Sequence, residues 1–261
     1  MQTMAEITSV KNPHILRVRE LATPKGRAAQ CAFLCDGEHL TAEALAACPR
    51  SVRTLFVEEN KREKYAPLLM QATAETACFM VNERVMTTLS QVTTPQGIAA
   101  VVELPRMVPL NEMGNKLVLL ENVQDPGNVG TILRTLDAAG FNGCILTSGC
   151  ADPFAPKTLR ATMGSIFRVP MAFAEKTEDA LRALKERGYA LLAAELSGEL
   201  FYGRGPLPQA LCLMIGNEGA GLTPDTCHAA THRFRLPMAG DAESLNAAVA
   251  AAVMMYDIMN R

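Results

Sequence analysis

The sequence predicts an α/β protein in which a smaller N-terminal α/β domain precedes a C-terminal α/β domain built on a parallel sheet. Short apolar runs alternate with segments of helical periodicity in both halves of the chain. In the C-terminal half these runs are apolar throughout, as in strands that are buried on both faces. Between the halves, residues 104–115 carry two prolines and a glycine without any period. We therefore expect domains at 1–103 and 117–261, joined by a linker at 104–116.

Length and composition are typical of a soluble globular protein. The chain has 261 residues, and its hydrophobic fraction of 49% is sufficient for a buried core. The most apolar stretch, residues 247–255, is too short to cross a membrane. The N-terminus lacks the long apolar segment of an export signal, so a cytoplasmic location is expected.

In the N-terminal half, the predicted elements alternate between helix and strand. Helices are expected at 12–21, 42–47 and 63–72, and strands at 31–35, 54–57, 77–81 and 98–102.

From residue 117 the alternation begins again. Strands are expected at 117–120, 144–146, 169–173, 190–194, 211–215 and 234–236, and helices at 129–139, 177–187 and 244–259. Such an order predicts a parallel sheet covered by helices on both faces. Ligands of these sheets bind at the carboxyl ends of the strands.

The charge balance argues against a protein that binds nucleic acid through its overall charge. The net charge is −2 and the isoelectric point is near 6.1. Any RNA contact must therefore be local. Basic residues outnumber acidic ones in the first thirty positions, and solvated helix faces would give the same pattern. The candidate RNA-binding residues are Lys11, Arg17, Arg19, Lys25 and Arg27.

Eight cysteines occur without a CxxC motif and mostly within apolar runs, which favours reduced thiols in the core. Cys227, His228 and His232 form the one pattern with metal-ligand spacing, since the two histidines would fall one helical turn apart. No further ligand completes the cluster, so an ordinary helix surface is favoured and no metal is expected.

The segment Glu121-Asn-Val-Gln-Asp-Pro-Gly-Asn-Val-Gly-Thr-Ile-Leu-Arg134 begins at the carboxyl end of a predicted strand. Asp125 and Pro126 suit the start of a helix, and Gly140 suits its end. Arg134 falls opposite the apolar stripe of this helix, so it points away from its own sheet. Arg134 could instead pair with Asp137. The stripe consists of Val129, Ile132, Leu133, Leu136 and Ala139, and the alternative for Asn128 is a helix cap.

A second segment, Ile215-Gly-Asn-Glu-Gly-Ala-Gly-Leu222, has glycines that allow close backbone approach. It lacks the Gly-Lys-Ser/Thr ending of a phosphate loop and the GxGxxG spacing. Glu218 would repel a phosphate, but it suits a sulfonium cation or an ordered hydrogen-bond network. A charge at a helix start is the alternative for Glu218.

The third segment, Leu236-Pro-Met-Ala-Gly-Asp-Ala-Glu-Ser-Leu-Asn246, leads irregularly into a helix that is expected to begin around Glu243 or Ser244. Ser244 could simply cap that helix. Asn246 lies in an apolar context, and a buried amide there needs polar partners.

Together and in this order, the three segments resemble the motifs of the SpoU (TrmH-like) family of RNA ribose methyltransferases, a branch of the SPOUT superfamily. The opening Ile7-Thr-Ser-Val-Lys-Asn-Pro13 is similar to the substrate-binding domain of many members. The resemblance implies an L30e-like N-terminal domain, a C-terminal trefoil knot and a homodimer with its active site at the subunit interface. It also implies transfer of a methyl group from S-adenosylmethionine to a ribose 2′-hydroxyl of ribosomal RNA or, as an alternative, of transfer RNA.

The family motifs can be carried over position by position. They imply catalytic roles for Asn128, Arg134, Glu218, Ser244 and Asn246. They also imply that the cofactor lies against backbone groups of Gly216, Leu236 and Leu245, with Leu196 and Met238 nearby. The chain departs from the motifs at Ala247 and Ala248, where the family usually has Val and Ser, which affects the expected packing beside the cofactor.

The implied chemistry is an in-line displacement in which alignment of the ribose oxygen and the methyl group dominates. A guanidinium stays protonated at neutral pH and is a poor base. We therefore hypothesise that Arg134 clamps a phosphate and polarises the 2′-hydroxyl, while Ser244, Asn246 or a phosphate oxygen relays the proton. Two competing classes are an RNA-binding or ribosome-assembly protein that transfers no methyl group and, less favoured, a nucleotide-binding oxidoreductase.

Overall fold

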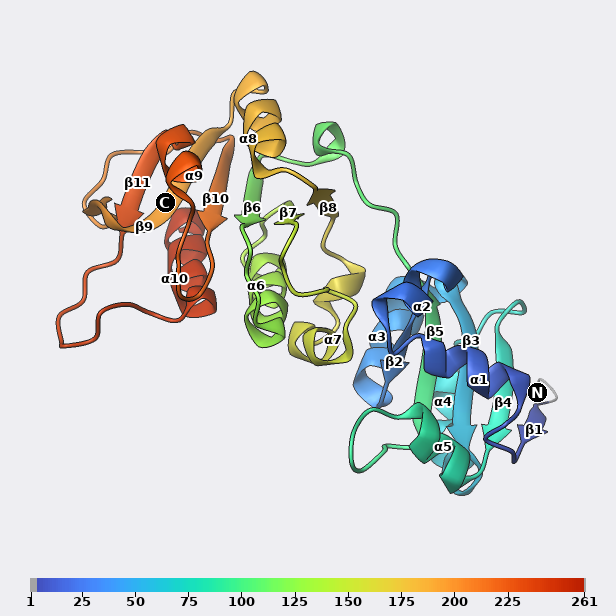
Figure 1. The fold of residues 1–261 in the computed structure, drawn as a ribbon. Coiled ribbons are helices and arrows are strands. Elements are labelled where there is room, and N and C mark those ends of the chain that lie inside the picture. Colours follow the sequence, from blue (N-terminus) through green and yellow to red (C-terminus); the bar gives the residue numbers. More distant parts are fainter. Residues whose placement is uncertain (1–3, 261) are drawn as a thin grey trace. The chain divides into compact units, whose positions relative to one another are not determined.

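The computed structural model describes residues 4–260, which form two compact units (Figure 1). The first unit comprises Met1–Pro105 together with Phe154–Phe167, and the second comprises Arg106–Pro153 and Arg168–Arg261. The second unit thus begins within the stretch expected to be a linker. Residues 154–167, which the sequence assigned to the C-terminal domain, belong to the first unit.

Aromatic packing explains why 154–167 belongs to the first unit. Phe154 and Phe167 have ring centroids 5.1 and 6.1 Å from that of Phe33. His39 Nε2 lies 3.2 Å from the carbonyl oxygen of Met163. Nothing in the local sequence of this segment signals such a distant partner.

The first unit is built on a mixed five-stranded sheet in the order β1-β4-β3-β5-β2. Strands β1, β4 and β3 are parallel, and β5 runs antiparallel to both β3 and β2. The strands are β1 (Ala5–Ile7), β2 (Ala32–Asp36), β3 (Val52–Glu58), β4 (Ala77–Val81) and β5 (Ile98–Glu103). The helices are α1 (Pro13–Glu20), α2 (Pro24–Gln30), α3 (Glu38–Ala47), α4 (Arg62–Leu69), α5 (Glu83–Leu89) and α7 (Pro156–Thr162).

The second unit is built on a six-stranded parallel sheet in the order β11-β9-β10-β6-β7-β8, as predicted for this half. Its strands are β6 (Lys116–Leu120), β7 (Gly143–Thr147), β8 (Met171–Ala174), β9 (Ala190–Leu200), β10 (Leu211–Ile215) and β11 (His232–Arg235). Its helices are α6 (Pro126–Ala138), α8 (Thr177–Glu186), α9 (Pro224–Ala229) and α10 (Ala247–Met259).

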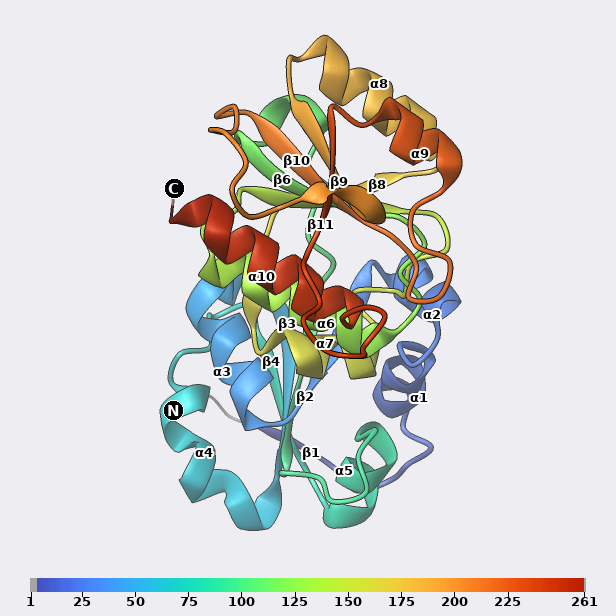
Figure 2. The same cartoon turned by 90° about the vertical axis from the view of Figure 1, so that its left-hand side faces the viewer.

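Helices cover both faces of this sheet (Figure 2). Helices α6 and α10 pack against each other on one face, and α8 and α9 pack on the other. The predicted apolar stripe of α6 is buried, and Gly140 beyond its end adopts a left-handed φ of +66°. No helix among residues 4–260 is long and apolar enough to cross a bilayer.

Candidate active site at the carboxyl end of the parallel sheet

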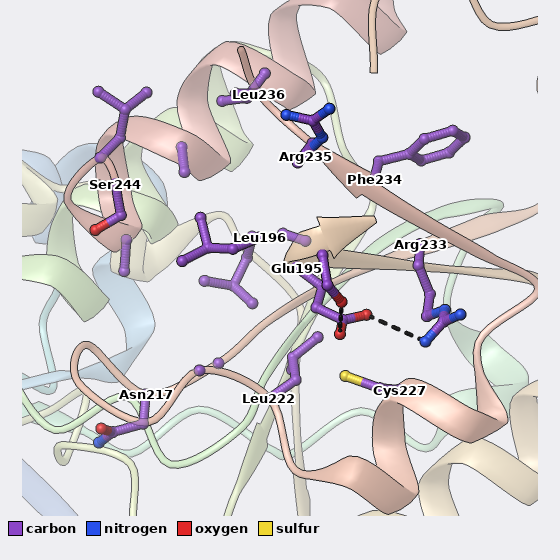
Figure 3. Close-up of a pocket in the computed structure, with 18 of the residues that line it drawn as sticks. Glu195, Leu196, Asn217, Leu222, Cys227, Arg233, Phe234, Arg235, Leu236 and Ser244 are labelled. Carbon is purple, nitrogen blue, oxygen red and sulfur yellow. Dashed lines mark hydrogen bonds and ion pairs between the residues drawn. The ribbon is translucent and has the colours of Figure 1, made fainter. Parts of the chain in front are cut away.

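A cavity of about 760 Å³ lies where β10 and β11 end and beside residues 194–197 of β9 (Figure 3). Its walls are largely apolar side chains and backbone, with a few charged groups, as in many small-molecule sites. Glu218 and Ser244 also line it. All five residues expected to bind the cofactor contribute to the lining, namely Leu196, Gly216, Leu236, Met238 and Leu245.

The loop after β10 is held in one shape by its own backbone. Asn217 and Gly221 exchange two backbone hydrogen bonds of 3.0 and 2.9 Å. The Asn217 side-chain oxygen also accepts from the N–H groups of Gly219 and Ala220. A Cβ at Gly216 would lie 2.1 Å from the carbonyl carbon of Gly221, so this approach requires glycine.

Glu218 joins this loop to the start of α6. Its Oε1 accepts hydrogen bonds from the backbone N–H of Asp125 at 3.0 Å and from Nδ2 of Asn128 at 2.8 Å. Its Oε2 accepts from the backbone N–H of Gln124 at 3.1 Å. Partial desolvation raises the pKa of Glu218, but the hydrogen bonds, led by that from Asn128, outweigh it and leave the pKa below its ordinary value. Glu218 is therefore ionised at neutral pH, and it ties the loop after β10 to the start of α6.

Asn128 extends this set of hydrogen bonds to α10. Its Oδ1 accepts from Nδ2 of Asn246 at 2.9 Å. The Oδ1 of Asn246 in turn accepts from the N–H groups of Ala248 and Val249, which makes Asn246 the cap of α10. One hydrogen-bond chain thus joins all three sequence segments.

Two capping alternatives considered from the sequence are wrong. Helix α10 starts at Ala247, so Ser244 lies in the preceding loop and does not cap it. Helix α6 is capped by Asp125, whose carboxylate accepts from the N–H of Asn128. The Asn128 side chain is therefore available for Glu218 and Asn246.

Glu121 is a residue whose role the sequence reasoning missed. It is only 4% exposed, directly after the buried strand β6. Its carboxylate accepts from the N–H and hydroxyl of Thr223, at 2.8 and 3.1 Å, and from the Thr226 hydroxyl at 2.7 Å. Glu121 thereby fixes the far end of the loop after β10. A carboxylate that directly follows the apolar run 117–120 was the available signal.

Arg134 is exposed on α6 and does not line the cavity. Within residues 4–260 its side chain makes no hydrogen bond or ion pair. The alternative of a pair with Asp137 is wrong, because that carboxylate binds Arg168 at 2.9 Å. The guanidinium is free to meet a ligand or another subunit.

The structure divides the basic residues of the first unit into exposed and buried groups. Lys11, Arg17, Arg19 and Lys25 are exposed. Arg27 is only 4% exposed, and its Nη1 donates to the carbonyl oxygen of Leu21 at 2.8 Å. The expectation that Arg27 binds RNA is therefore wrong, since its guanidinium serves the interior of this unit.

The pattern of Cys227, His228 and His232 does not lie on one helix. Helix α9 ends at Ala229, and His232 opens β11. In the part of the chain that the structure describes, no three His, Cys, Asp or Glu side chains are placed to hold a metal ion.

Comparison with known proteins relates this site to a family. Residues 115–256 match the family model of the SpoU rRNA Methylase family, and residues 12–100 match the MRM3-like substrate binding domain. The 23S rRNA (guanosine(2553)-2′-O)-methyltransferase RlmP of Bacillus subtilis is 35% identical over 98% of this chain and 99% of its own. A 23S rRNA (uridine(2479)-2′-O)-methyltransferase of Streptomyces viridochromogenes is 30% identical over 80% of this chain and 76% of its own.

Solved structures agree with these relatives. The AdoMet-bound rRNA methyltransferase of Sinorhizobium meliloti has a TM-score of 0.85 and 35% identity, with 98% of each chain covered. The SpoU methyltransferase AviRb of Streptomyces viridochromogenes, in complex with AdoMet, has a TM-score of 0.83 and 28% identity, with 96% of this chain and 98% of that chain covered. The arrangement of the three segments and the matched family model lead to one conclusion: this chain belongs to the SpoU rRNA methylase family.

Proposed function

We propose that this protein is an S-adenosylmethionine-dependent methyltransferase that methylates a ribose 2′-hydroxyl in ribosomal RNA. The observation that carries the proposal is the hydrogen-bond chain from Glu218 through Asn128 to Asn246, beside the cavity. The names of two relatives, both 23S rRNA 2′-O-methyltransferases, favour ribosomal over transfer RNA. Such a substrate agrees with the expected cytoplasmic location. The same family membership supports a trefoil knot that includes residues 215–222 and 236–246.

The cavity suits the proposed cofactor. Leu196, Leu236 and Leu245 offer apolar contact to a purine, and the neighbouring backbone offers hydrogen bonds. When bound, the cofactor supplies an electrophilic methyl group on a sulfonium.

Arg134 and Ser244 are the residues we assign to the RNA. The guanidinium of Arg134 binds a phosphate and draws electron density from the 2′-hydroxyl. Ser244 is exposed at the cavity, and its hydroxyl makes no hydrogen bond among residues 4–260. It can therefore accept the ribose proton and pass it to a phosphate oxygen or to water.

Asn128, Glu218 and Asn246 act by positioning. All three side chains already hold hydrogen bonds to one another or to backbone N–H groups. The lowered pKa of Glu218 keeps it ionised, and the Asn246 amide is not a base. These residues hold the loop after β10 against α6 and α10, so that the cavity keeps its shape.

We further propose that two copies of the chain assemble and that Arg134 serves the cavity of the partner subunit. Arg134 does not line the cavity of its own chain. Helix α10, which packs on α6, exposes Val249, Tyr256 and Met259, and such an apolar stripe is a typical subunit interface. Sedimentation velocity should show a dimer, and Tyr256→Glu should shift it towards monomer.

Mixed dimers test the shared site directly. Arg134→Ala and Ser244→Ala chains, each inactive alone, should regain about a quarter of wild-type activity after mixing and exchange, because half of the dimers then hold one complete site. No recovery, despite proven exchange of subunits, would contradict a site shared between subunits.

Methyl transfer itself is tested with labelled S-adenosylmethionine and bulk RNA. Label should enter ribosomal RNA, and 2′-O-methyl mapping in cells with and without the protein should reveal one or a few differing riboses. Label in transfer RNA instead would identify transfer RNA as the substrate. Cofactor binding without transfer to any RNA would favour an RNA-binding or ribosome-assembly protein that transfers no methyl group.

A further inference from the structure

The cavity has a polar end that none of the residues assigned above accounts for. In Figure 3, Glu195, Arg233 and Cys227 lie together on one side of Leu196, whereas Ser244 and Asn217 lie on the other. Ser244, to which we assign the ribose proton, marks the side on which the methyl group is transferred. The Glu195 side therefore faces a different part of any ligand that fills the cavity.

An interruption in the sheet places Glu195 there. Strand β11 pairs Arg233 with Ala193 and then Phe234 with Glu199, so residues 194–198 of β9 have no partner in β11. Pairing of β9 with β10 also ends at Ala193. The unpaired residues bulge out, and the side chains of Glu195 and Leu196 reach the cavity.

The bulge is fixed by close backbone contacts. A Cβ at Gly198 would lie 2.6 Å from the carbonyl carbon of Arg233, so only glycine allows β11 to pass this close. The Nε of Arg235 donates to the carbonyl oxygen of Gly198 at 3.1 Å. Glu195 is therefore held at the cavity wall by the strand geometry.

The two carboxylate oxygens of Glu195 differ in their partners. Oε1 accepts a hydrogen bond of 2.5 Å from the Ser197 hydroxyl. Among residues 4–260, buried Oε2 accepts no hydrogen bond from a nitrogen or oxygen; the Cys227 thiol is a weak partner of this carboxylate, and Nη1 of Arg233 lies 3.8 Å from Oε2. The Arg233 side chain is 52% exposed and can move aside. A buried carboxylate oxygen without a strong donor destabilises the folded protein, and a ligand that donates a hydrogen bond to it removes this cost.

The neighbouring thiol does not satisfy that oxygen fully. Desolvation, followed by the charge of Glu195, raises the pKa of Cys227 to about 11. Cys227 is therefore a neutral thiol at physiological pH, and a thiol is a weak donor. An O–H or N–H of a ligand would form a stronger hydrogen bond with Glu195 than the Cys227 thiol does.

We propose that Glu195 accepts a hydrogen bond from a hydroxyl or amine of the adenosine part of S-adenosylmethionine and thereby selects for that nucleoside. This inference rests on the proposed function. A sulfonium carries no hydrogen to donate. The ammonium of the amino-acid tail is the other donor of this cofactor, and 5′-methylthioadenosine, which lacks that tail, separates the two: a loss that spares 5′-methylthioadenosine would assign the contact to the tail and overturn the proposal. The adenosine combines a purine face for Leu196 and Leu236 with hydrogen-bond donors at its edge.

Calorimetric binding to the full-length protein tests this without measuring activity. Glu195→Gln should raise Kd about tenfold for S-adenosylmethionine, S-adenosylhomocysteine and 5′-methylthioadenosine alike, because they share the adenosine. The matched control Glu199→Gln, on the same strand but outside the cavity lining, should change Kd less than about twofold. A loss confined to S-adenosylmethionine would indicate a charge effect on the sulfonium and overturn the proposal, as would no loss at all.

Two analogues separate the hydroxyl from the amine. The homocysteine thioether of 2′,3′-dideoxyadenosine lacks both ribose hydroxyls, and that of purine riboside lacks the amine. The analogue that lacks the true donor should bind wild type and Glu195→Gln with equal affinity. Two analogues that both remain sensitive to Glu195→Gln would place the contact outside the adenosine and contradict the proposal.

Arg233→Met provides a second variant in case Glu195→Gln fails to fold. It should bind S-adenosylmethionine as tightly as wild type or more tightly, because Arg233 only covers the oxygen. A tenfold loss in Arg233→Met would make the arginine the ligand-binding group and overturn the proposal. Failure of the wild-type protein to bind S-adenosylmethionine would instead reject the proposed function.

Discussion

Compared with the first unit, the second unit holds the polar side chains of its candidate site much more tightly. Glu218, Asn128 and Asn246 are joined by hydrogen bonds of 2.8 and 2.9 Å between residues 90 and 118 positions apart. In the first unit, Lys11 and Arg17 are exposed and unpaired among residues 4–260. A site that must align two reacting atoms needs fixed groups, whereas a surface that follows an RNA backbone does not. Single substitutions should therefore have large effects on activity in the second unit and small effects on RNA affinity in the first.

The largest expected effect is that of Arg134→Ala. Loss of a charged group that acts at the reacting atoms should lower kcat/KM about a thousandfold. The calorimetric Kd for S-adenosylmethionine should stay within about twofold, because we assign Arg134 to the RNA and not to the cofactor. Arg134→Lys should keep partial activity at neutral pH, since a point charge still binds phosphate. Complete loss of activity in Arg134→Lys, with normal RNA and cofactor binding, would contradict the hypothesis that Arg134 acts mainly by binding a phosphate.

Asn128→Asp should have the next largest effect. It removes the donor to Glu218 and places a second carboxylate beside it, in a residue that is 8% exposed. We expect about 2 kcal/mol loss in the free energy of unfolding and a fall in activity of about a hundredfold. Urea unfolding and the methyl-transfer assay measure both. Asn111→Asp makes the same chemical change at an exposed position and should cost less than about 0.5 kcal/mol. Equal effects of the two substitutions would show that the hydrogen-bond chain through Asn128 contributes nothing specific to stability or activity.

Glu218 should make the second unit sensitive to acid. Its pKa in the folded protein lies below the ordinary value near 4.5, so its contribution to stability is complete above that pH and is lost as the pH falls through the folded pKa. The Tm of Glu218→Gln should be lower than that of wild type at pH 7, and the difference should shrink below about pH 4. Glu199→Gln serves as the control. A Tm difference that stays constant across this range would rule out ionisation as the cause.

The smallest single effects are expected on the basic surface of the first unit. Each alanine substitution at Lys11, Arg17, Arg19 or Lys25 should weaken RNA binding a few-fold. It should also lower the slope of the salt dependence by about one for each phosphate that the variant no longer binds. Fluorescence anisotropy at several salt concentrations measures this. Lys64→Ala, which removes a lysine already paired with Glu38 at 2.6 Å, should change little. Arg27→Ala should instead lower the Tm.

Sequence reasoning succeeded where local pattern decides the structure. Strands β4 and β10 have the predicted bounds, and the α6 stripe is buried with Arg134 on the opposite side. It failed where a distant partner decides. Strand β9 runs beyond Ala194 to Leu200 because β11 pairs with its polar end after the bulge. The antiparallel direction of β5 is likewise set by its neighbours.

The candidate site shows the same division. Motif positions identified Glu218, Ser244 and the five expected cofactor-binding residues, all of which line the cavity. The sequence favoured Ser244 as the cap of α10, whereas the Asn246 side chain is the one that reaches the first free N–H groups. Charge counting placed Arg27 with the RNA-binding residues because it carries no information on burial. Glu195 escaped notice because its setting arises from a register shift between two strands.

The assignment of Phe154–Phe167 to the first unit means that the polypeptide passes between the units three times, after Pro105, after Pro153 and after Phe167. A gene truncated at Pro105 would encode a fragment without the two aromatic rings that cover Phe33. Limited proteolysis at the first crossing alone would separate the first 105 residues covalently from the rest of the chain, and residues 154–167 would remain attached to the second unit. Domain-swap chimaeras with related enzymes therefore need to exchange two stretches of sequence together, and a single fusion point would produce an incomplete core.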